Sequence, residues 1–331
     1  MRGITTMHYR QAFARRFAGL DCAVAPFIPT VNAERINPKL LKDVLPENNA
    51  DLPLIPQLIS NHADDFIRMC DALRDLGYEE VNWNLGCPHK PIRNRKRGSG
   101  LLPYPDTVDR LLDQICQGSP IRVSVKVRLG ISNPSDLMAL IPVLNNHPVS
   151  EVIVHPRTAE QMYTGSADLD AFEEAYAALT RPVCYNGDIG TRSTFRTIQT
   201  RFPEIHRFML GRGLLADPFL CEEIKRCGEQ GRDDATSPDL DPLPRLKERH
   251  CDGDQVERIA AFHDDLLARY ESALRGDHPV LGKMKEFWKY QSLHLSNGHD
   301  MFKKLKKTRH LHSYKAIVSE FLEEASWNPP V

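Results

Sequence analysis

The residues best suited to chemistry in this chain surround one thiol, Cys87, which stands between a glycine and a proline that interrupt regular structure. Residues 81–85 read as a short buried strand, so we expect the thiol in a loop at the C-terminal end of that strand. The loop continues through four basic residues within 93–97 and a Gly-Ser-Gly sequence at 98–100. The predicted surroundings of the thiol are therefore cationic, and barrel enzymes carry their chemistry on loops of this kind.

Polar side chains also stand at the ends of other predicted strands. Gln57 ends one of them, and Lys126 and Arg128 end another. Because side chains alternate along a strand, Lys126 and Arg128 are expected to point to the same side. A lysine inside an apolar strand is costly to bury without compensation. It therefore either pairs with a carboxylate inside the sheet or presents its charge to a bound anionic ring system.

Two glycine-containing turns, at 186–190 and 211–213, follow the last two predicted strands and run into helices. Backbone N–H groups at such turns bind phosphate readily, and in many barrels the last two loops form the phosphate site. Arg212 lies within the second turn. The pattern predicts a cofactor that carries a phosphate. His155, near Arg157 at another strand end, is either a satisfied core residue or part of this anion site.

Apolar runs alternate with amphipathic segments over the first two thirds of the chain. The predicted strands are Cys22–Ala25, Leu54–Leu58, Glu80–Leu85, Arg122–Val127, Glu151–His155, Pro182–Asn186 and Arg207–Leu210. The predicted helices are His8–Phe17, Ala63–Leu76, Pro105–Cys116, Pro134–Asn145, Leu169–Ala178 and Ser193–Thr200. This alternation predicts an α/β fold with a parallel sheet, of the TIM (β/α)8 type at this length. A loop and a helix precede the first strand found, so we expect a further strand before Met1.

Three segments are expected along the chain: a catalytic barrel over 1–228, a linker over 229–255 and a helical domain over 256–331. The linker is rich in Asp, Pro and Gly. The helical domain is predicted to contain the helices Val256–Arg275, Val280–Leu293 and His312–Glu324. Its basic residues include Lys303, Lys304, Lys306 and Lys307. These lysines form either a solvated helix face or a surface that binds the phosphates of a polyanion.

The totals limit the classes of protein to consider. The chain has 331 residues, a formal net charge of −1 and 41% hydrophobic residues, so the overall charge does not indicate a nucleic-acid binder. Its eight cysteines contain no CxxC pair and no zinc spacing, and we predict no metal site. Without a signal peptide or a membrane-length apolar run, we expect a reduced, cytoplasmic protein with no membrane association and no obligate protein partner.

Taken together, these segments resemble the tRNA-dihydrouridine synthase family over residues 1 to about 216. The motifs that carry the resemblance are Met1-Arg2-Gly3-Ile4-Thr5, Asn84-Leu85-Gly86-Cys87-Pro88 with Gly98-Ser99-Gly100, Ser124-Val125-Lys126-Val127-Arg128-Leu129-Gly130, His155-Pro156-Arg157-Thr158, Asn186-Gly187-Asp188-Ile189 and Gly211-Arg212-Gly213. They follow in the order and spacing of the family. The resemblance implies an FMN-dependent barrel enzyme with a helical tRNA-binding domain, which reduces specific uridines in tRNA to 5,6-dihydrouridine with NADPH as the reductant.

The resemblance also implies roles for individual residues. Gln57 and Lys126 would hold the isoalloxazine ring, and His155 would line the FMN pocket. Asn84 and Arg128 would face the uridine. The other cofactor-binding residues would be Met1, Arg2 and Gly3 against the ring, and Asn186, Gly187, Asp188, Gly211 and Arg212 at the ribityl phosphate end. The tRNA backbone would be bound by Arg95 and by Lys303, Lys304, Lys306 and Lys307.

The implied reaction agrees with the chemistry of the residues. Reduction of the uracil C5–C6 double bond needs a hydride at C6, which a flavin supplies, and a proton at C5, for which the neutral thiol of Cys87 is a suitable donor. No dinucleotide-binding GxGxxG fingerprint is present, so NADPH rests on the resemblance alone. Two other hypotheses remain open: an FMN-dependent barrel reductase of a small pyrimidine-like substrate, and an inactive RNA-binding relative.

Overall fold

The structure of the protein is a computed structural model that describes residues 3–32, 35–230 and 255–329. It divides into two compact units, each formed by separate stretches of chain. The first unit consists of Met1–Thr6, Cys22–Asp188 and Gln199–Gly211. The second unit consists of Met7–Asp21, Ile189–Ile198 and Arg212–Val331. Each unit is described by itself, and the predicted linker 229–255 lies almost entirely outside the described residues.

The first unit is built on a parallel sheet of seven strands that neighbour one another in chain order. Its strands are β2 (Ile28–Pro29), β4 (Gln57–Ile59), β5 (Glu80–Leu85), β6 (Arg122–Gly130), β7 (Val152–Thr158), β8 (Val183–Tyr185) and β9 (Arg207–Phe208). A separate parallel pair joins β1 (Ala23–Val24) to β3 (Leu54–Ile55). Each predicted strand is present, although Leu54–Leu58 is divided into β3 and β4, and β2 was not predicted. Chain-order pairing of parallel strands is the arrangement of a (β/α)8 barrel. The strand expected before Met1 would lie outside this sequence and stays a prediction.

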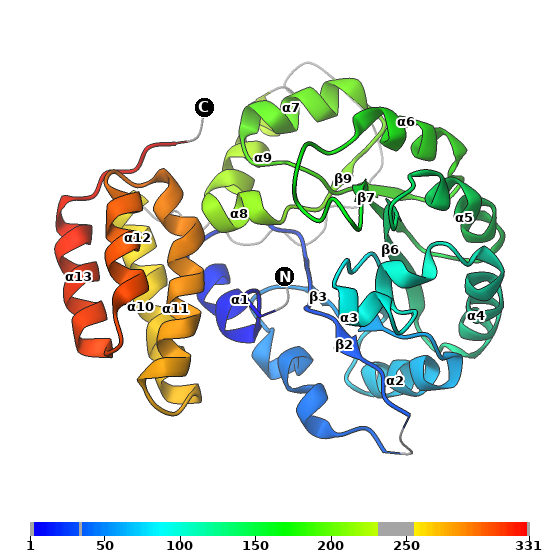
Figure 1. Cartoon of the computed structure of the whole chain (residues 1–331), viewed down its shortest axis with the longest axis horizontal. Helices are drawn as coiled ribbons and strands as arrows, with labels where there is room; N and C mark the ends of the chain where they lie inside the picture. The colour runs from blue at the N-terminus through cyan, green and yellow to red at the C-terminus, as the bar shows by residue number, and fades with distance from the viewer. Residues whose placement is uncertain (1–2, 33–34, 231–254, 330–331) are drawn as a thin grey trace. The chain divides into compact units, whose positions relative to one another are not determined.

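Helices cover the outer side of this sheet, as Figure 1 shows for the part coloured from cyan to green. They are α2 (Ala63–Asp75), α4 (Pro105–Gly118), α5 (Ser135–Asn146) and α6 (Leu169–Ala178), and α7 (Arg192–Arg201) has residues in both units. Local chemistry starts two of them: α4 begins with a proline, and the Asp168 side chain accepts the Ala171 N–H at the start of α6. With helices outside, strands such as β7 are buried throughout.

Seven helices lie wholly within the second unit in its described residues. They are α1 (Met7–Ala14), α8 (Arg212–Ala216), α9 (Leu220–Gln230), α10 (Gln255–Ala273), α11 (Asp277–Gln291), α12 (Gly298–Lys307) and α13 (Leu311–Glu324). Aromatic side chains form its core: Phe262 of α10 meets Tyr9 and Phe13 of α1 edge-on, and also Phe287 of α11. Trp288 donates to the hydroxyl of Tyr314 at 2.8 Å.

The predicted helix His8–Phe17 appears as α1, whose Tyr9 and Phe13 pack against Phe262 of α10. The helical part differs from the sequence prediction in the number of its helices. The sequence predicts three helices after residue 255, and the structure has four there, because the prediction missed α12. This helix has only ten residues, so the helical spacing of its buried residues, Gly298, Met301 and Leu305, extends over a short stretch. No helix within the described ranges is long and apolar enough to span a bilayer.

Candidate active site

The backbone of Cys87 is held on both sides where the chain leaves β5. The Asn84 side-chain oxygen accepts the N–H groups of Gly86 at 3.1 Å and of Cys87 at 2.8 Å. The Cys87 carbonyl accepts the N–H of Ser99 at 3.2 Å and its hydroxyl at 2.8 Å. The thiol is therefore carried by a loop whose backbone has defined partners before and after it.

The Gly-Ser-Gly sequence is needed for this loop to close. Gly98 has a φ of +57°, in the left-handed region, and a side chain there would place its Cβ 2.9 Å from the Cβ of Cys87. At Gly100 a Cβ would lie 2.4 Å from the carbonyl oxygen of Arg93. Both glycines therefore allow close backbone approach within the Cys87 loop, which explains why this part of the motif accompanies the thiol.

A chain of side-chain amides ties the Cys87 loop to the neighbouring strands. Asn84 donates to Gln57 at 2.8 Å, Gln57 donates to Asn82 at 2.7 Å, and Asn82 donates to Ser124 at 3.0 Å. All four side chains are buried. Buried amides of this kind must be bonded, and each –NH2 has a second hydrogen beyond the bond it makes here. The predicted contacts of Gln57 with flavin and of Asn84 with uridine would use those second hydrogens.

Lys126 lies on β6 opposite Asn84 of β5, and its ammonium donates to the side-chain oxygen of Asn186 at 2.5 Å. Asn186 in turn donates to the carbonyl of Met209 at 2.7 Å, which positions its amide. Burial, and secondly the charge of Arg128, lowers the pKa of Lys126 to about 7. No carboxylate in the described ranges lies within ion-pair distance of this ammonium, so the alternative of a lysine–carboxylate pair is not realised there.

This arrangement fits a bound anionic ring. A partly buried ammonium that donates only to an amide oxygen gains most from a ligand that brings negative charge, because such a ligand offsets the cost of its desolvation. The residues predicted to hold flavin, Gln57 and Lys126, stand on β4 and β6 with Asn84 of β5 between them. The donors therefore suit a planar, hydrogen-bonding, anionic cofactor.

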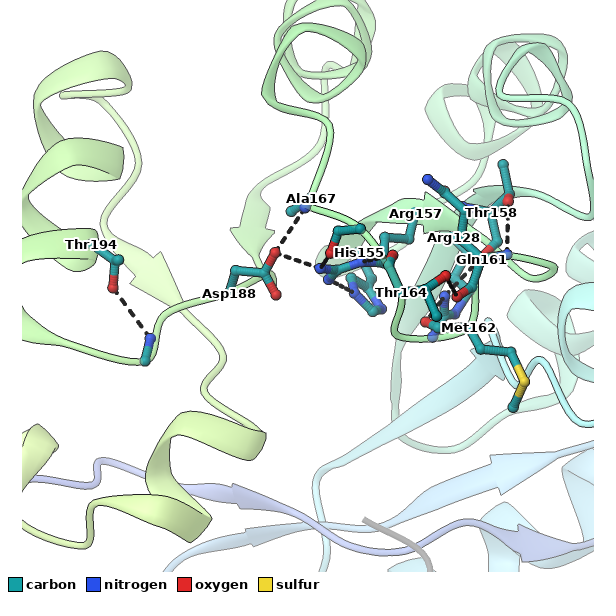
Figure 2. Close-up of polar contacts among 12 residues, drawn as sticks. Arg128, His155, Arg157, Thr158, Gln161, Met162, Thr164, Ala167, Asp188 and Thr194 are labelled. Atoms are coloured by element: carbon teal, nitrogen blue, oxygen red, sulfur yellow. Dashed lines mark hydrogen bonds and ion pairs between the residues drawn. The ribbon is translucent and has the colours of Figure 1, made fainter. Parts of the chain in front are cut away.

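Arg128, which the resemblance places against the uridine, is directed at the chain's own backbone. It is 3% exposed, and its Nη1 donates to the carbonyls of Thr158 at 2.9 Å and Met162 at 2.8 Å (Figure 2). Burial lowers the pKa of Arg128 to about 10, with the charge and a side-chain hydrogen bond of Tyr163 acting in the opposite direction. The guanidinium stays protonated at neutral pH and holds the loop that follows β7.

Arg157 is engaged in the same way and is only 1% exposed. It donates to the carbonyls of Thr164 at 3.3 Å and Gly165 at 2.7 Å and to the carboxylate of Asp188 at 2.5 Å (Figure 2). Its Nη1 also lies 3.2 Å from Nε2 of His155. Since arginine can only donate, Nε2 of His155 is the acceptor in this contact, which assigns the ring proton to Nδ1.

Asp188 was predicted to help bind phosphate, and its side chain serves another purpose here. The Asp188 carboxylate accepts hydrogen bonds from Arg157 and, at 2.8 Å, from the N–H of Ala167. The backbone of Asp188 has a φ of +44°. A carboxylate repels phosphate, so any phosphate contact of this residue would come from its backbone. The neighbouring Gly187 is buried, and a Cβ there would lie 3.0 Å from the Tyr185 hydroxyl.

The remaining predicted residues are more dispersed. In the first unit, Gly3 has a φ of +81°, Arg95 is exposed, and Gly211 has open space where a Cβ would be. Arg212 opens α8, a helix of five residues in the second unit. Met1 and Arg2 lie outside the described residues. The four lysines are exposed on α12: Lys303, Lys304, Lys306 and Lys307.

The structure therefore brings together part of the predicted site. Pairing register and hydrogen bonds connect the following predicted residues within the first unit: Gln57, Asn84, Cys87, Lys126, Arg128, His155, Asn186 and Asp188. Sequence reasoning missed Asn82 and Ser124, and the loop-holding role of Arg157. The sequence could have predicted a role for Asn82, because Asn82 and Asn84 are two polar residues, two positions apart, that alternate with apolar, buried residues of β5. In the ranges described, no cluster of His, Cys, Asp or Glu could hold a metal ion.

The first unit is thus a parallel α/β barrel-type unit with polar side chains and one thiol at its strand ends. The family model described as "Dihydrouridine synthase (Dus)" matches residues 1–253, and the chain belongs to this family of enzymes. A probable tRNA-dihydrouridine synthase of Rhodobacter capsulatus is 29% identical over 228 residues, which is 68% of each chain. The tRNA-dihydrouridine synthase B of Vibrio cholerae is 25% identical over 255 residues, 75% of each chain.

A solved structure supports the fold alone. Histamine dehydrogenase from Rhizobium sp. 4-9 aligns with a TM-score of 0.51 and 9% identity, over 68% of this chain and 44% of that one. The chain therefore spans less than half of that larger protein. The α/β fold of TIM type and the resemblance to the tRNA-dihydrouridine synthase family are both confirmed.

Proposed function

We propose that this protein reduces uridines in tRNA to 5,6-dihydrouridine, with FMN as its bound cofactor and NADPH as the reductant. Membership of the dihydrouridine synthase family supports the reaction, and both relatives above are named as tRNA-dihydrouridine synthases. The single observation that carries the proposal is that Lys126 of β6 pairs in register with Asn84 of β5, whose side chain accepts the Cys87 N–H, so that the lysine and the Cys87 loop share one neighbour. A cytoplasmic location is part of the same proposal.

The site residues divide the work of the reaction. Bound flavin supplies the hydride for C6 of the uracil ring, chemistry that no protein side chain offers. Lys126 offsets the negative charge of the cofactor, and Gln57 donates a hydrogen bond to it. Cys87 delivers the proton to C5 of the uracil ring. Its hydrogen bonds with Asn84 and Ser99 hold its backbone in one position, which would keep the thiol in place for this transfer.

Binding of tRNA is proposed to use exposed cations. The target base must leave its stack to reach a strand-end site, and unpaired loop nucleotides leave most easily. Arg95, exposed on the Cys87 loop, would contact the backbone near that base. The exposed lysines of α12 would contact phosphates elsewhere on the tRNA. The roles proposed for Arg212, Met1 and Arg2 rest on the resemblance alone.

The direct test is reconstitution. Purified protein is incubated with FMN, NADPH and tRNA transcribed in vitro, and the digested nucleosides are analysed for dihydrouridine by mass spectrometry. We expect dihydrouridine only when tRNA, protein and both cofactors are present. Comparison of tRNA from a deletion strain and its parent would then identify the uridine that is modified.

Two other results would replace the proposal. If free pyrimidines were reduced and tRNA were not, the protein would be a barrel reductase of a small substrate. If tRNA were bound in a salt-sensitive manner but the protein neither retained flavin nor formed product, it would be an inactive RNA-binding relative. Visible flavin absorbance of the purified protein separates this last outcome from the other two.

A further inference from the structure

The loop between β7 and α6, residues 159–168, is anchored at several points. Arg128 and Arg157 together donate to the carbonyls of three residues along it, Met162, Thr164 and Gly165, and to the carbonyl of Thr158 directly before it. The loop also bonds to itself, since the Thr158 N–H donates to the Gln161 side chain at 2.7 Å. Figure 2 shows the side chains of Arg128 and Arg157 together with Thr158, Met162 and Thr164 of this region. Two buried cations are thus used to hold one surface segment.

The outer side of the same loop presents two large side chains to solvent. Met162 is 46% exposed and Tyr163 is 45% exposed, among the most exposed large hydrophobic residues in the described ranges. Met162 also has a φ of +49°, a left-handed conformation that a methionine rarely adopts. A loop held this firmly around an unfavourable backbone conformation, with apolar groups outward, is typical of a functional surface.

The loop lies beside the candidate active site. Arg128 pairs in register with His155, and its charge interacts with Cys87 and with Tyr163. The guanidinium carbon of Arg128 is 5.4 Å from the centroid of the Tyr163 ring. The Cys87 loop approaches the same arginine, because a Cβ at Gly86 would lie 3.5 Å from its Cγ. The loop that carries the exposed pair and the Cys87 loop therefore both approach Arg128.

We propose that Met162 and Tyr163 form a stacking platform for the nucleotides that flank the target uridine. The proposal rests on the proposed function, because it assigns the platform to RNA. An aromatic ring and a thioether side by side suit the faces of unpaired bases, and contact of this kind tolerates any base. Arg128 and Arg157 are positioning residues that act through the loop.

The test is a double-mutant cycle in which one change is made in the protein and the other in the tRNA, and the affinity of each combination is measured. Tyr163→Ala and Tyr163→Phe are each measured against tRNA and against tRNA in which the nucleotides flanking the target uridine are abasic. We expect Tyr163→Ala to weaken binding of ordinary tRNA about tenfold, while turnover at saturating tRNA changes less than about twofold. Tyr163→Phe keeps its ring and should bind as the wild type does. On the abasic tRNA all three proteins should bind alike.

A matched control separates this role from general effects of removing an exposed methionine. Met162→Ala should weaken tRNA binding severalfold, whereas Met138→Ala, which truncates an exposed methionine of α5, should not change it. Flavin content and the midpoint of thermal unfolding should stay the same in both methionine variants, since these side chains face solvent. Tyr163→Ala also removes a ring that lies 5.4 Å from Arg128, so its midpoint should fall while its flavin content stays the same.

Either of two outcomes overturns the platform. One is that Tyr163→Ala weakens binding of intact and abasic tRNA equally. The other is that it lowers the rate at saturating tRNA with unchanged affinity, which would place the ring on the reacting base. Failure of the proposed function is distinguishable, because the wild type would then form no dihydrouridine from any tRNA.

Discussion

The cations of the candidate active site are bonded to other groups of the protein, whereas the lysines of α12 are exposed to solvent. Lys126, Arg128 and Arg157 each donate to defined acceptors, an amide oxygen in the first case and chiefly backbone carbonyls in the others. The α12 lysines are exposed, and the nearest partners are weak: Lys303 lies 3.3 Å from the exposed Asp300, and Lys306 lies over Phe302 at 5.3 Å.

The difference shows two uses of positive charge in one chain. A buried cation acts through its position, so that moving or neutralising it alters a specific contact at any ionic strength. An exposed lysine acts through the field that it adds to its neighbours, and salt screens that field. The first kind is suited to holding a cofactor or a loop, and the second kind to attracting a long polyanion.

The largest effect is expected at Cys87, which lies near the buried cations. Cys87→Ala should lower the rate of uridine reduction about a thousandfold, the usual scale for loss of a general acid. Flavin content and tRNA affinity should stay as in the wild type. Single-turnover reduction of tRNA measures the rate, and an unchanged rate would show that the proton comes from another group.

Lys126→Met should be the next most severe change. It removes the one ammonium that donates to Asn186, so flavin affinity should fall about 10- to 100-fold. Fluorescence titration of the flavin-free protein with FMN measures this. Lys289→Met, a change of the same type on α11, is the control and should leave FMN affinity as it is. If both variants bound FMN normally, the ammonium would serve another ligand.

Reversal of the α12 charges should have a smaller and salt-dependent effect. Replacement of Lys303, Lys304, Lys306 and Lys307 by Glu should weaken tRNA binding about tenfold at low salt and reduce the steepness with which affinity falls as salt rises. FMN binding should not change. Equal affinity and an equal salt slope for variant and wild type would mean that tRNA binds a different surface.

The smallest effect concerns stability and pH. Because the pKa of Lys126 is lowered from 10.5 to about 7, the unfolded chain binds this proton more tightly than the folded protein does. The resulting penalty is full below pH 7 and disappears as the pH rises toward 10.5. Flavin-free Lys126→Met should therefore be more stable than the wild type by about 1–3 kcal/mol at pH 6, with the gap closing at pH 10. Urea unfolding at both pH values measures it, and a constant gap would contradict this assignment.

The site was predictable where a side chain follows from strand position. Cys87 follows a buried strand and Lys126 lies within another, and the period of two is enough to place Lys126 and Arg128 on one side of the sheet. Arg157 could not be assigned from the sequence, because its partners are the carbonyls of Thr164 and Gly165 in the following loop and the carboxylate of Asp188. The helix α12 was not predicted, because its apolar pattern extends over only ten residues.

The sequence by itself determined the order of strands and helices, the thiol loop with its Gly-Ser-Gly requirement, and the family. These depend on local patterns: alternation, breakers, and glycines where a Cβ would collide. Only the tertiary structure decided which cations are engaged and which are exposed, and that α1 packs with α10. Those outcomes depend on residues that are distant in the chain meeting in space, and burial sets the free energy of a charge only after they meet.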